Sequence, residues 1–269
     1  MKFKAHLAQI YLIGLFIFLY LPIGYLIYYA FNQADTMNQF TGFSFRHFTE
    51  LFNDTRMLVI LMNTFMLAFL AALIATIIGL GGAMAIRYTR RKIHRNALLT
   101  LNNILMVSPD VIIGSSFLIL FTVLGTYFSK LQLGFWTVLL SHIAFSIPIV
   151  VLMILPKLQE LPTSMIQAAY DLGAAPHQVM IKVILPFLTP SIIAAYFMAF
   201  TYSLDDFAVT FFVTGGGFTT LSVEIYSRAR QGISLEINAL STLVFIFALL
   251  LVVGYYFISH QNQPVKEKE

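Results

Sequence analysis

Long apolar runs, separated by short polar segments, set the pattern of the chain. Six of them are long enough to cross a bilayer as helices, which takes about 20 apolar residues. The first run follows Lys2 and Lys4, but it is too long for a signal peptide and no small-residue cleavage site follows it, so we expect a retained helix. The pattern predicts an all-α, polytopic membrane protein with six transmembrane helices in a single domain, 1–269. The predicted spans lie near 8–31, 57–86, 97–124, 135–155, 187–212 and 237–259.

Composition supports a protein solvated mainly by lipid. Of the 269 residues, 59% are hydrophobic and only 10% are charged, whereas soluble domains carry about 25% charged residues. The chain has no cysteine, which excludes disulfides, thiolate metal sites and cysteine nucleophiles. Its six histidines show no metal-ligand spacing, and no phosphate-binding loop or hydrolase motif is present. We therefore expect no catalytic residue, metal or bound cofactor, and no nucleic-acid partner.

Lysine and arginine are distributed unevenly between the two predicted sides. If the N-terminus lies inside, the cytoplasmic segments carry eleven of these residues and the opposite side carries five. Cytoplasmic loops of membrane proteins are enriched in Lys and Arg, so both termini are predicted to be cytoplasmic. The stretch RYTRRKIHR, 87–95, anchors this orientation. The segment 159–186 is then a cytoplasmic loop, and 261–269 is predicted to be a disordered tail.

Two predicted outer loops carry features of their own. The loop 32–56 carries phenylalanines among polar residues at positions 43, 45, 48 and 52. Their spacing fits an amphipathic segment at the membrane surface, and it equally fits aromatic side chains that pack on helix ends. The loop 213–236 starts with a run of glycines, and its second half is predicted to form a short helix at the membrane surface.

The cytoplasmic loop contains the start and stop signals of two short helices. Pro162 followed by hydroxyl residues predicts a helix start, and Gly173 can end this first helix in a left-handed conformation. Pro176 suits the first turn of a second helix, which is predicted to stop at Pro186. Small residues between these helices would leave a shallow surface for another protein. A plain helical linker between two spans remains the alternative.

Three acidic residues lie within predicted spans. An ionisable side chain at mid-membrane is costly, about 2.5–3.5 kcal/mol on insertion scales, so it usually faces a cavity or a partner. Asp110 follows a proline in the third run, while Asp205 and Asp206 lie in the middle of the fifth, beside Tyr202 and Phe207. These five residues are predicted to line a path for a cationic substrate, with cation–π contacts from the rings. A protonated carboxyl, a helix–helix bond or an ion pair with a partner chain are the alternatives.

Helix geometry limits which polar residues of the spans can line such a path. Adjacent residues on a helix point about 100° apart, so Asp205 and Asp206 cannot both face one path fully. His142 and Ser141 in the fourth run are interpreted as contacts between helices rather than as substrate ligands.

The stretch QAAYDLGAAPHQVMIKVILP, 167–186, resembles the EAA loop of ABC-importer permeases, which docks into a cytoplasmic ATPase. The match covers Gln167-Ala168-Ala169, Gly173 and Val183-Ile184-Leu185-Pro186. It departs from the family pattern in Gln167, where the family has Glu, and in Val183, where it has Ile. The resemblance implies that the ATPase-coupling residues are Gln167, Ala168, Ala169, Asp171, Leu172, Gly173, Ala174 and Pro186.

Further segments are similar to the PotC-type subunits of spermidine/putrescine importers, and the likeness extends over most of the chain. The segments are SPDVIIGSSFLILF, LGFWTVLLSHIAFSIPIVV, SLDDFAVTFFVTG and IYSRARQGISLEINALST. The resemblance implies a permease of the bacterial cytoplasmic (inner) membrane that imports polyamines and catalyses no chemistry itself. It implies three kinds of protein partner: a homologous second permease (PotB-like), two cytoplasmic ATPase subunits (PotA-like) that bind ATP and Mg, and an extracytoplasmic polyamine-binding protein (PotD-like).

Two other functions remain open at the level of the sequence. A permease of the same architecture for another cationic or metal-complexed solute would share the loop and differ in the cavity. A non-transporting membrane scaffold or an intramembrane enzyme would belong to a different class, and the EAA-like loop argues against both.

Overall fold

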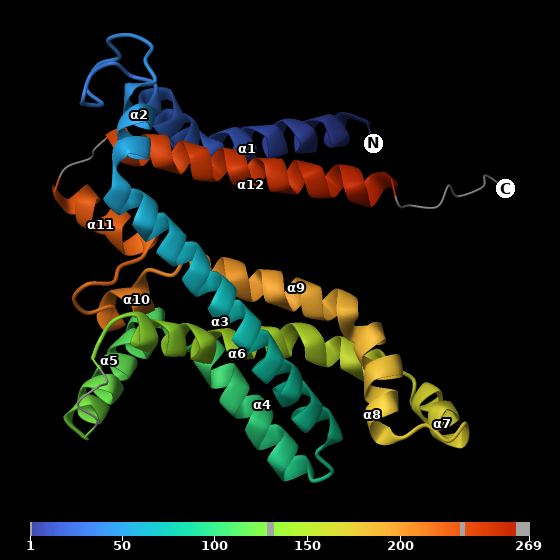
Figure 1. The fold of residues 1–269 in the computed structure, drawn as a ribbon. Coiled ribbons are helices and arrows are strands. Elements are labelled where there is room, and N and C mark those ends of the chain that lie inside the picture. The colour runs from blue at the N-terminus through green and yellow to red at the C-terminus, as the bar shows by residue number, and fades with distance from the viewer. Residues whose placement is uncertain (1, 128–131, 232–234, 262–269) are drawn as a thin grey trace. The chain divides into compact units, whose positions relative to one another are not determined.

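The computed structural model describes residues 2–127, 132–231 and 235–261 (Figure 1). Apart from an isolated bridge between Asn32 and Phe43, the regular structure of these residues is helical. The chain divides into two compact units, 1–58 with 225–269, and 59–224. The helices are α1 (Lys2–Ala30), α2 (Arg46–Asn53), α3 (Thr55–Tyr88), α4 (Lys92–Val107), α5 (Asp110–Tyr127), α6 (Phe135–Glu160), α7 (Thr163–Asp171), α8 (Pro176–Val179), a π turn (Met180–Ile184), α9 (Leu185–Leu204), α10 (Ala208–Val213), α11 (Leu221–Gln231) and α12 (Leu235–Gln261).

Five described segments are long and apolar enough to cross a membrane, and they coincide with or overlap the first five predicted runs. The sixth predicted span corresponds to α12, in which Leu235–Ile246 forms a shorter apolar stretch among the described residues. A sixth span and cytoplasmic termini therefore stay predictions. The predicted tail lies beyond Gln261, the last described residue, so nothing tests it. The five segments are Gln9–Ala30, Thr55–Tyr88, Asp110–Tyr127, Phe135–Glu160 and Pro176–Leu204.

Two predicted runs are not continuous helices. The run 97–124 is split into α4 and α5 at Ser108 and Pro109. Ser108 is extended, with φ −70° and ψ 135°, because a residue before proline is pushed out of the helical region. The run 187–212 is split into α9 and α10, so the prediction that Asp205 and Asp206 lie within one helix is wrong.

In the unit formed by 1–58 and 225–269, α1 and α12 lie side by side and α2 packs on α12 (Figure 1). The aromatic side chains of the loop gather on the end of α1. Phe31 stacks on Phe43 with ring centroids 5.2 Å apart, and its ring also contacts Phe45 and Phe48. These contacts fit the interpretation of aromatic packing on a helix end, although the rings of Phe43 and Phe45 keep large exposed surfaces.

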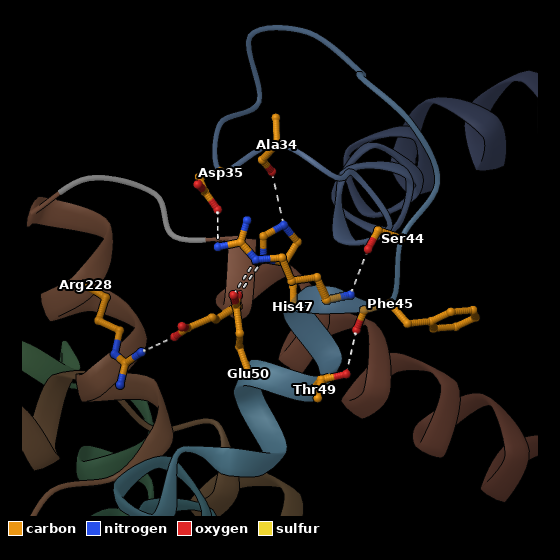
Figure 2. Close-up of polar contacts among 10 residues, drawn as sticks. Ala34, Asp35, Ser44, Phe45, His47, Thr49, Glu50 and Arg228 are labelled. Carbon is orange, nitrogen blue, oxygen red and sulfur yellow. Dashed lines mark hydrogen bonds and ion pairs between the residues drawn. The ribbon is translucent and has the colours of Figure 1, made fainter.

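A polar network fixes the start of α2 (Figure 2). Arg46 donates to Glu50 at 2.6 Å and pairs with Asp35 at 3.3 Å. The ring nitrogens of buried His47 lie 3.1 Å from a carboxylate oxygen of Glu50 and 3.1 Å from the carbonyl oxygen of Ala34. Both neighbours are acceptors, so both bonds form only when the ring is protonated. Partial burial raises the pKa of Glu50, but the hydrogen bonds from Arg46 and His47 outweigh it and hold this pKa below its ordinary value.

Arg228 of α11 bridges two carboxylates of the same unit. It lies 3.1 Å from Asp54 and 2.9 Å from Glu236. Partial burial raises the pKa of Asp54, but hydrogen bonds from Arg228 and from the Met57 backbone outweigh it, so the pKa lies below its ordinary 3.8.

The depressed pKa of Asp54 predicts a specific loss of stability in acid. A carboxyl whose folded pKa is lowered stabilises fully above the unfolded pKa, and this contribution disappears as pH falls through the folded pKa. We expect Asp54→Asn to lose about 0.5–1 kcal/mol at pH 7 and to show a shallower fall in thermal midpoint below pH 4 than the parent. Asp35→Asn, at a 70% exposed side chain, is the matched control and should leave the acid profile unchanged. Parallel profiles for the parent and Asp54→Asn would contradict the prediction.

In the unit formed by 59–224, α6 lies at the centre and packs against α4, α5, α9 and α10. One core cluster joins α3, α6 and α9, and α3 contributes the fully buried alanines 72, 75 and 83. Small residues let membrane helices approach closely. A Cβ atom on Gly79 would lie 2.5 Å from Val150 Cγ1, so α3 and α6 approach at this glycine.

The contact between α5 and α10 depends on a second glycine, Gly114. A Cβ atom there would lie 2.8 Å from the Phe212 ring and 3.1 Å from the backbone of Ala208 and Val209. We expect Gly114→Ala to destabilise the chain by about 1–3 kcal/mol, measured by thermal unfolding in detergent, because backbone atoms must move. Gly81→Ala is the control: nothing lies within 4 Å of its Cβ, so helix propensity should make it neutral or stabilising. Equal midpoints for the two variants would contradict this packing.

Candidate functional site

The helix that follows the loop 159–186 breaks at the two adjacent acids. Helix α9 ends at Leu204, and the backbone N–H of Asp205 still bonds to the Thr201 carbonyl at 3.2 Å. Asp206 then accepts the backbone N–H groups of Val209 at 3.3 Å and Thr210 at 2.9 Å. Its carboxylate satisfies donors that a new helix start leaves open, so Asp206 initiates α10.

A buried histidine holds this break to α6. His142 is fully buried, and its Nδ1 lies 2.7 Å from Ser203 Oγ of α9. Its Nε2 lies 2.8 Å from Thr210 Oγ1 of α10 and 3.4 Å from Asp206 Oδ2. One ring therefore connects three helices, which confirms the interpretation of His142 as a contact between helices.

The donor in each hydrogen bond of this network follows from the one atom that can only accept. The Thr210 hydroxyl lies 2.7 Å from Asp206 Oδ2, a carboxylate oxygen that can only accept. Because its single proton goes to Asp206, the hydroxyl accepts from His142 Nε2–H. In the neutral ring, Nδ1 then accepts from Ser203. Every member of this buried network has a partner, which makes it rigid.

The other two acids have different surroundings. Asp110 is exposed at the start of α5, and the Tyr202 hydroxyl donates to its Oδ1 at 3.4 Å. The Tyr202 ring is held edge-to-face against Phe145, with centroids 5.1 Å apart. Asp205 is exposed at the break, three residues after Tyr202. Within the described part of the chain, neither Asp110 nor Asp205 has an ion-pair partner.

The structure thus separates the five predicted path residues. The Tyr202 hydroxyl is hydrogen-bonded to exposed Asp110, and Asp205 is exposed three residues after Tyr202, while Asp206 is 9% exposed and fully engaged. Phe207 is half-buried, and its ring packs 5.4 Å from that of Phe211. Sequence reasoning missed Ser203 and Thr210. The signal was available in the four-residue separation of Asp206 and Thr210, which a capping carboxylate can span.

The first helix of the loop 159–186 ends in a Schellman motif. The Gly173 N–H bonds to the Tyr170 carbonyl at 2.9 Å, and the Ala174 N–H bonds to the Ala169 carbonyl at 3.0 Å. Gly173 has φ +80°, a left-handed conformation that favours glycine, so the predicted role of Gly173 is confirmed. The helix start at Thr163 and Pro176 in the first turn of α8 are confirmed as well.

The loop presents one face outward and one face to the core. Ala169 and Ala174 pack against the cluster of α3, α6 and α9. Leu172, at the tip, is 88% exposed, an unusual position for a leucine unless a partner or lipid covers it. The other predicted coupling residues on the outer face are also exposed: Gln167, Ala168, Asp171, Gly173 and Pro186.

The prediction that the second helix stops at Pro186 is wrong. The chain continues without interruption from α8 through the π turn Met180–Ile184 into α9. A proline ring crowds the preceding turn and offers no N–H. The π turn immediately before it widens the backbone, with the Leu185 N–H bonded to Met180, so the helix passes Pro186 in its first turn.

The helix break, the buried network and the Schellman loop lie within a segment that matches a known family. The model of the binding-protein-dependent transport system inner membrane component matches residues 77–266. The chain belongs to this family. It is a transport permease that spans the cytoplasmic membrane several times.

Curated relatives are similar over most of the chain. It is 34% identical to the spermidine/putrescine transport system permease PotC of Haemophilus influenzae, covering 95% of this chain and 97% of the relative. It is 35% identical to PotC of Escherichia coli K12, covering 93% and 92%, respectively. It is 37% identical to the putrescine permease PotI of the same strain, covering 85% and 82%.

Solved structures support the fold alone. A bacterial ABC transporter chain involved in import of the acidic polysaccharide alginate superposes with a TM-score of 0.72 at 19% identity, covering 98% of this chain and 96% of that one. A chain of the inward-facing MetNI methionine ABC transporter superposes with a TM-score of 0.59 at 20% identity, covering 78% and 100%, respectively.

Proposed function

We propose that this chain is a permease subunit of an ATP-driven importer that moves polyamines, spermidine or putrescine, across the cytoplasmic membrane. The observation that carries the proposal is the pair of unneutralised carboxylates, Asp110 and Asp205, beside Tyr202 at a break in a membrane helix. The names of the PotC and PotI relatives support the same solute class.

The geometry suits a cation held weakly. Two carboxylates with no basic partner among the described residues attract an ammonium group, and the Tyr202 ring adds a cation–π face. The Phe145 contact fixes the orientation of that ring. Asp206 and His142 hold the helix break in place through their hydrogen bonds to Thr210. A few weak contacts of this kind let the solute enter and leave, whereas a tight site would trap it.

The cytoplasmic loop is proposed to receive an ATPase. Its exposed face comprises Gln167, Ala168, Asp171, Leu172 and Gly173, and the exposed leucine at its tip suits an apolar groove on a partner. Gln167 supplies an amide where the family has a carboxylate, so the contact at this position is a hydrogen bond rather than an ion pair.

The full transporter is proposed to contain a homologous second permease (PotB-like), two cytoplasmic ATPase subunits (PotA-like) and an extracytoplasmic polyamine-binding protein (PotD-like). ATP and Mg bind the ATPase subunits in this proposal, and this chain binds no cofactor. ATP-driven closure of the ATPases would move the loop and shift the helices between outward- and inward-open states.

The test is uptake of radiolabelled spermidine and putrescine by liposomes that contain this chain, the second permease, the ATPase and the binding protein. We expect saturable, ATP-dependent uptake that unlabelled polyamine competes away. A complex without the binding protein is the matched control and should take up little label.

Two outcomes would overturn parts of the proposal. An assembled complex that hydrolyses ATP without polyamine uptake would reject polyamines as the solute and point to another cation. A chain that assembles with no ATPase at all would reject the importer.

A further inference from the structure

A cluster of basic residues lies where α3 gives way to α4. The basic turn, defined as Arg87, Arg90, Arg91, Lys92 and Arg95, places five cations within nine residues. Arg87 belongs to the last turn of α3, two arginines form the turn, and Lys92 begins α4. The cluster therefore starts where a membrane-spanning helix ends.

The charge of the basic turn is not neutralised by the rest of the described chain. No acidic residue occurs between Asp54 and Asp110 in the sequence. Among the described residues, none of these five cations takes part in an ion pair. Four of the five cations are exposed, and only Arg87 is half-buried, with its guanidinium 5.9 Å from the Tyr88 ring.

Apolar side chains interrupt the basic turn and point into the surroundings. Ile93 is 82% exposed and Tyr88 is 50% exposed. A large apolar residue in the middle of a basic segment fits the boundary between headgroups and acyl chains, where the side chain enters the apolar layer and the cations stay with the headgroups. The helix that follows, α4, packs on α6 but buries none of its side chains completely.

We propose that the basic turn binds the headgroups of anionic phospholipids. The charge complementarity is direct, since several unpaired cations lie at the end of a span and within a Debye length of the membrane surface. Arginine suits phosphate because its planar guanidinium donates two parallel hydrogen bonds. The proximity to the span favours lipid over a soluble acidic partner. The inference does not depend on which solute the permease transports.

The test is native mass spectrometry of the full chain in detergent, titrated with phosphatidylglycerol or with phosphatidylcholine of the same acyl chains. We expect preferential binding of phosphatidylglycerol, and weaker binding at higher salt because exposed charges are screened. Arg91→Gln should lower the affinity about five-fold, and Arg90→Gln with Arg91→Gln about 25-fold, since each cation near an anionic surface contributes similarly.

Two controls keep the test decisive. Arg46→Gln removes the same charge in a different loop and should leave phosphatidylglycerol binding unchanged. The double variant Arg90→Lys with Arg91→Lys keeps both positive charges and is expected to fold normally. It should therefore retain most of the phosphatidylglycerol binding. Equal affinity for the two lipids, no salt dependence, or an undiminished affinity of the folded glutamine variants would overturn the proposal. A preference for an acidic protein over phosphatidylglycerol would overturn it as well.

Discussion

Replacing Asp205 with asparagine is expected to raise the KM for polyamine uptake by about 10- to 100-fold while the complex still assembles. The magnitude follows from a hydrogen bond to a charged group, which contributes about 1.5–3 kcal/mol. Asp205 is exposed at the helix break and has no ion-pair partner among the residues described, so its removal should leave the fold intact. The measurement is initial uptake rate against polyamine concentration in liposomes.

The adjacent acid supplies a matched control with a different expected outcome. Asp206→Asn weakens the acceptor for two backbone donors and the Thr210 hydroxyl, so it should lower the thermal midpoint of the purified chain. Asp205→Glu keeps the charge and should restore most of the uptake. If Asp205→Asn transports with the parent KM, Asp205 does not contact the solute, and if both asparagine variants lose only stability, neither acid does.

Replacing Leu172 with aspartate is expected to reduce the amount of ATPase that copurifies with this chain by about 30-fold. Loss of a hot-spot side chain near the centre of a protein interface costs about 2 kcal/mol or more. Leu172, 88% exposed at the tip of the loop, is the side chain to which we assign this role. The exposed position predicts an unchanged thermal midpoint for the chain alone. Copurification through an affinity tag on this chain, followed by ATPase activity, measures the effect.

Variants at Gly173 test whether ATPase binding depends on the backbone conformation of the loop. Gly173→Val should cost about 1–2 kcal/mol of local stability because φ is +80°, and it should also reduce copurification. Gly173→Asn is the control, since asparagine tolerates the left-handed region and no atom lies within 4 Å of the added Cβ. If the Leu172→Asp variant copurifies as much ATPase as the parent, the loop does not form the interface with the ATPase.

The unbroken helix from Pro176 to Leu204 connects the two candidate sites. Its 29 residues extend about 40 Å, from the exposed loop to the acidic break. Ala169 and Ala174 join the loop to the same core cluster that holds α9. A displacement of the loop therefore has a continuous helical path to Asp205, which is how we propose that ATPase motion reaches the solute site.

Local sequence signals determined the parts of the fold that depend on neighbouring residues. Apolar run length located the five spanning segments, because a helix in lipid must satisfy its own backbone and present apolar side chains along about 30 Å. Gly173 and Pro176 marked helix boundaries correctly, because a positive φ and a missing N–H are properties of the residue itself. Pro186 misled the prediction because its effect depends on the π turn before it.

The tertiary structure decided what the acids do. Asp205 and Asp206 are identical in residue type and adjacent in the sequence, and both were predicted to line a path. One is exposed beside Tyr202, and the other caps α10 and contacts the His142–Thr210 pair. His142 is 68 residues from Thr210, and no local pattern encodes a contact over that separation. The difference between an exposed carboxylate and one that caps a helix comes from which helices meet at the break, and only the packing of α6 against α9 and α10 brings them there.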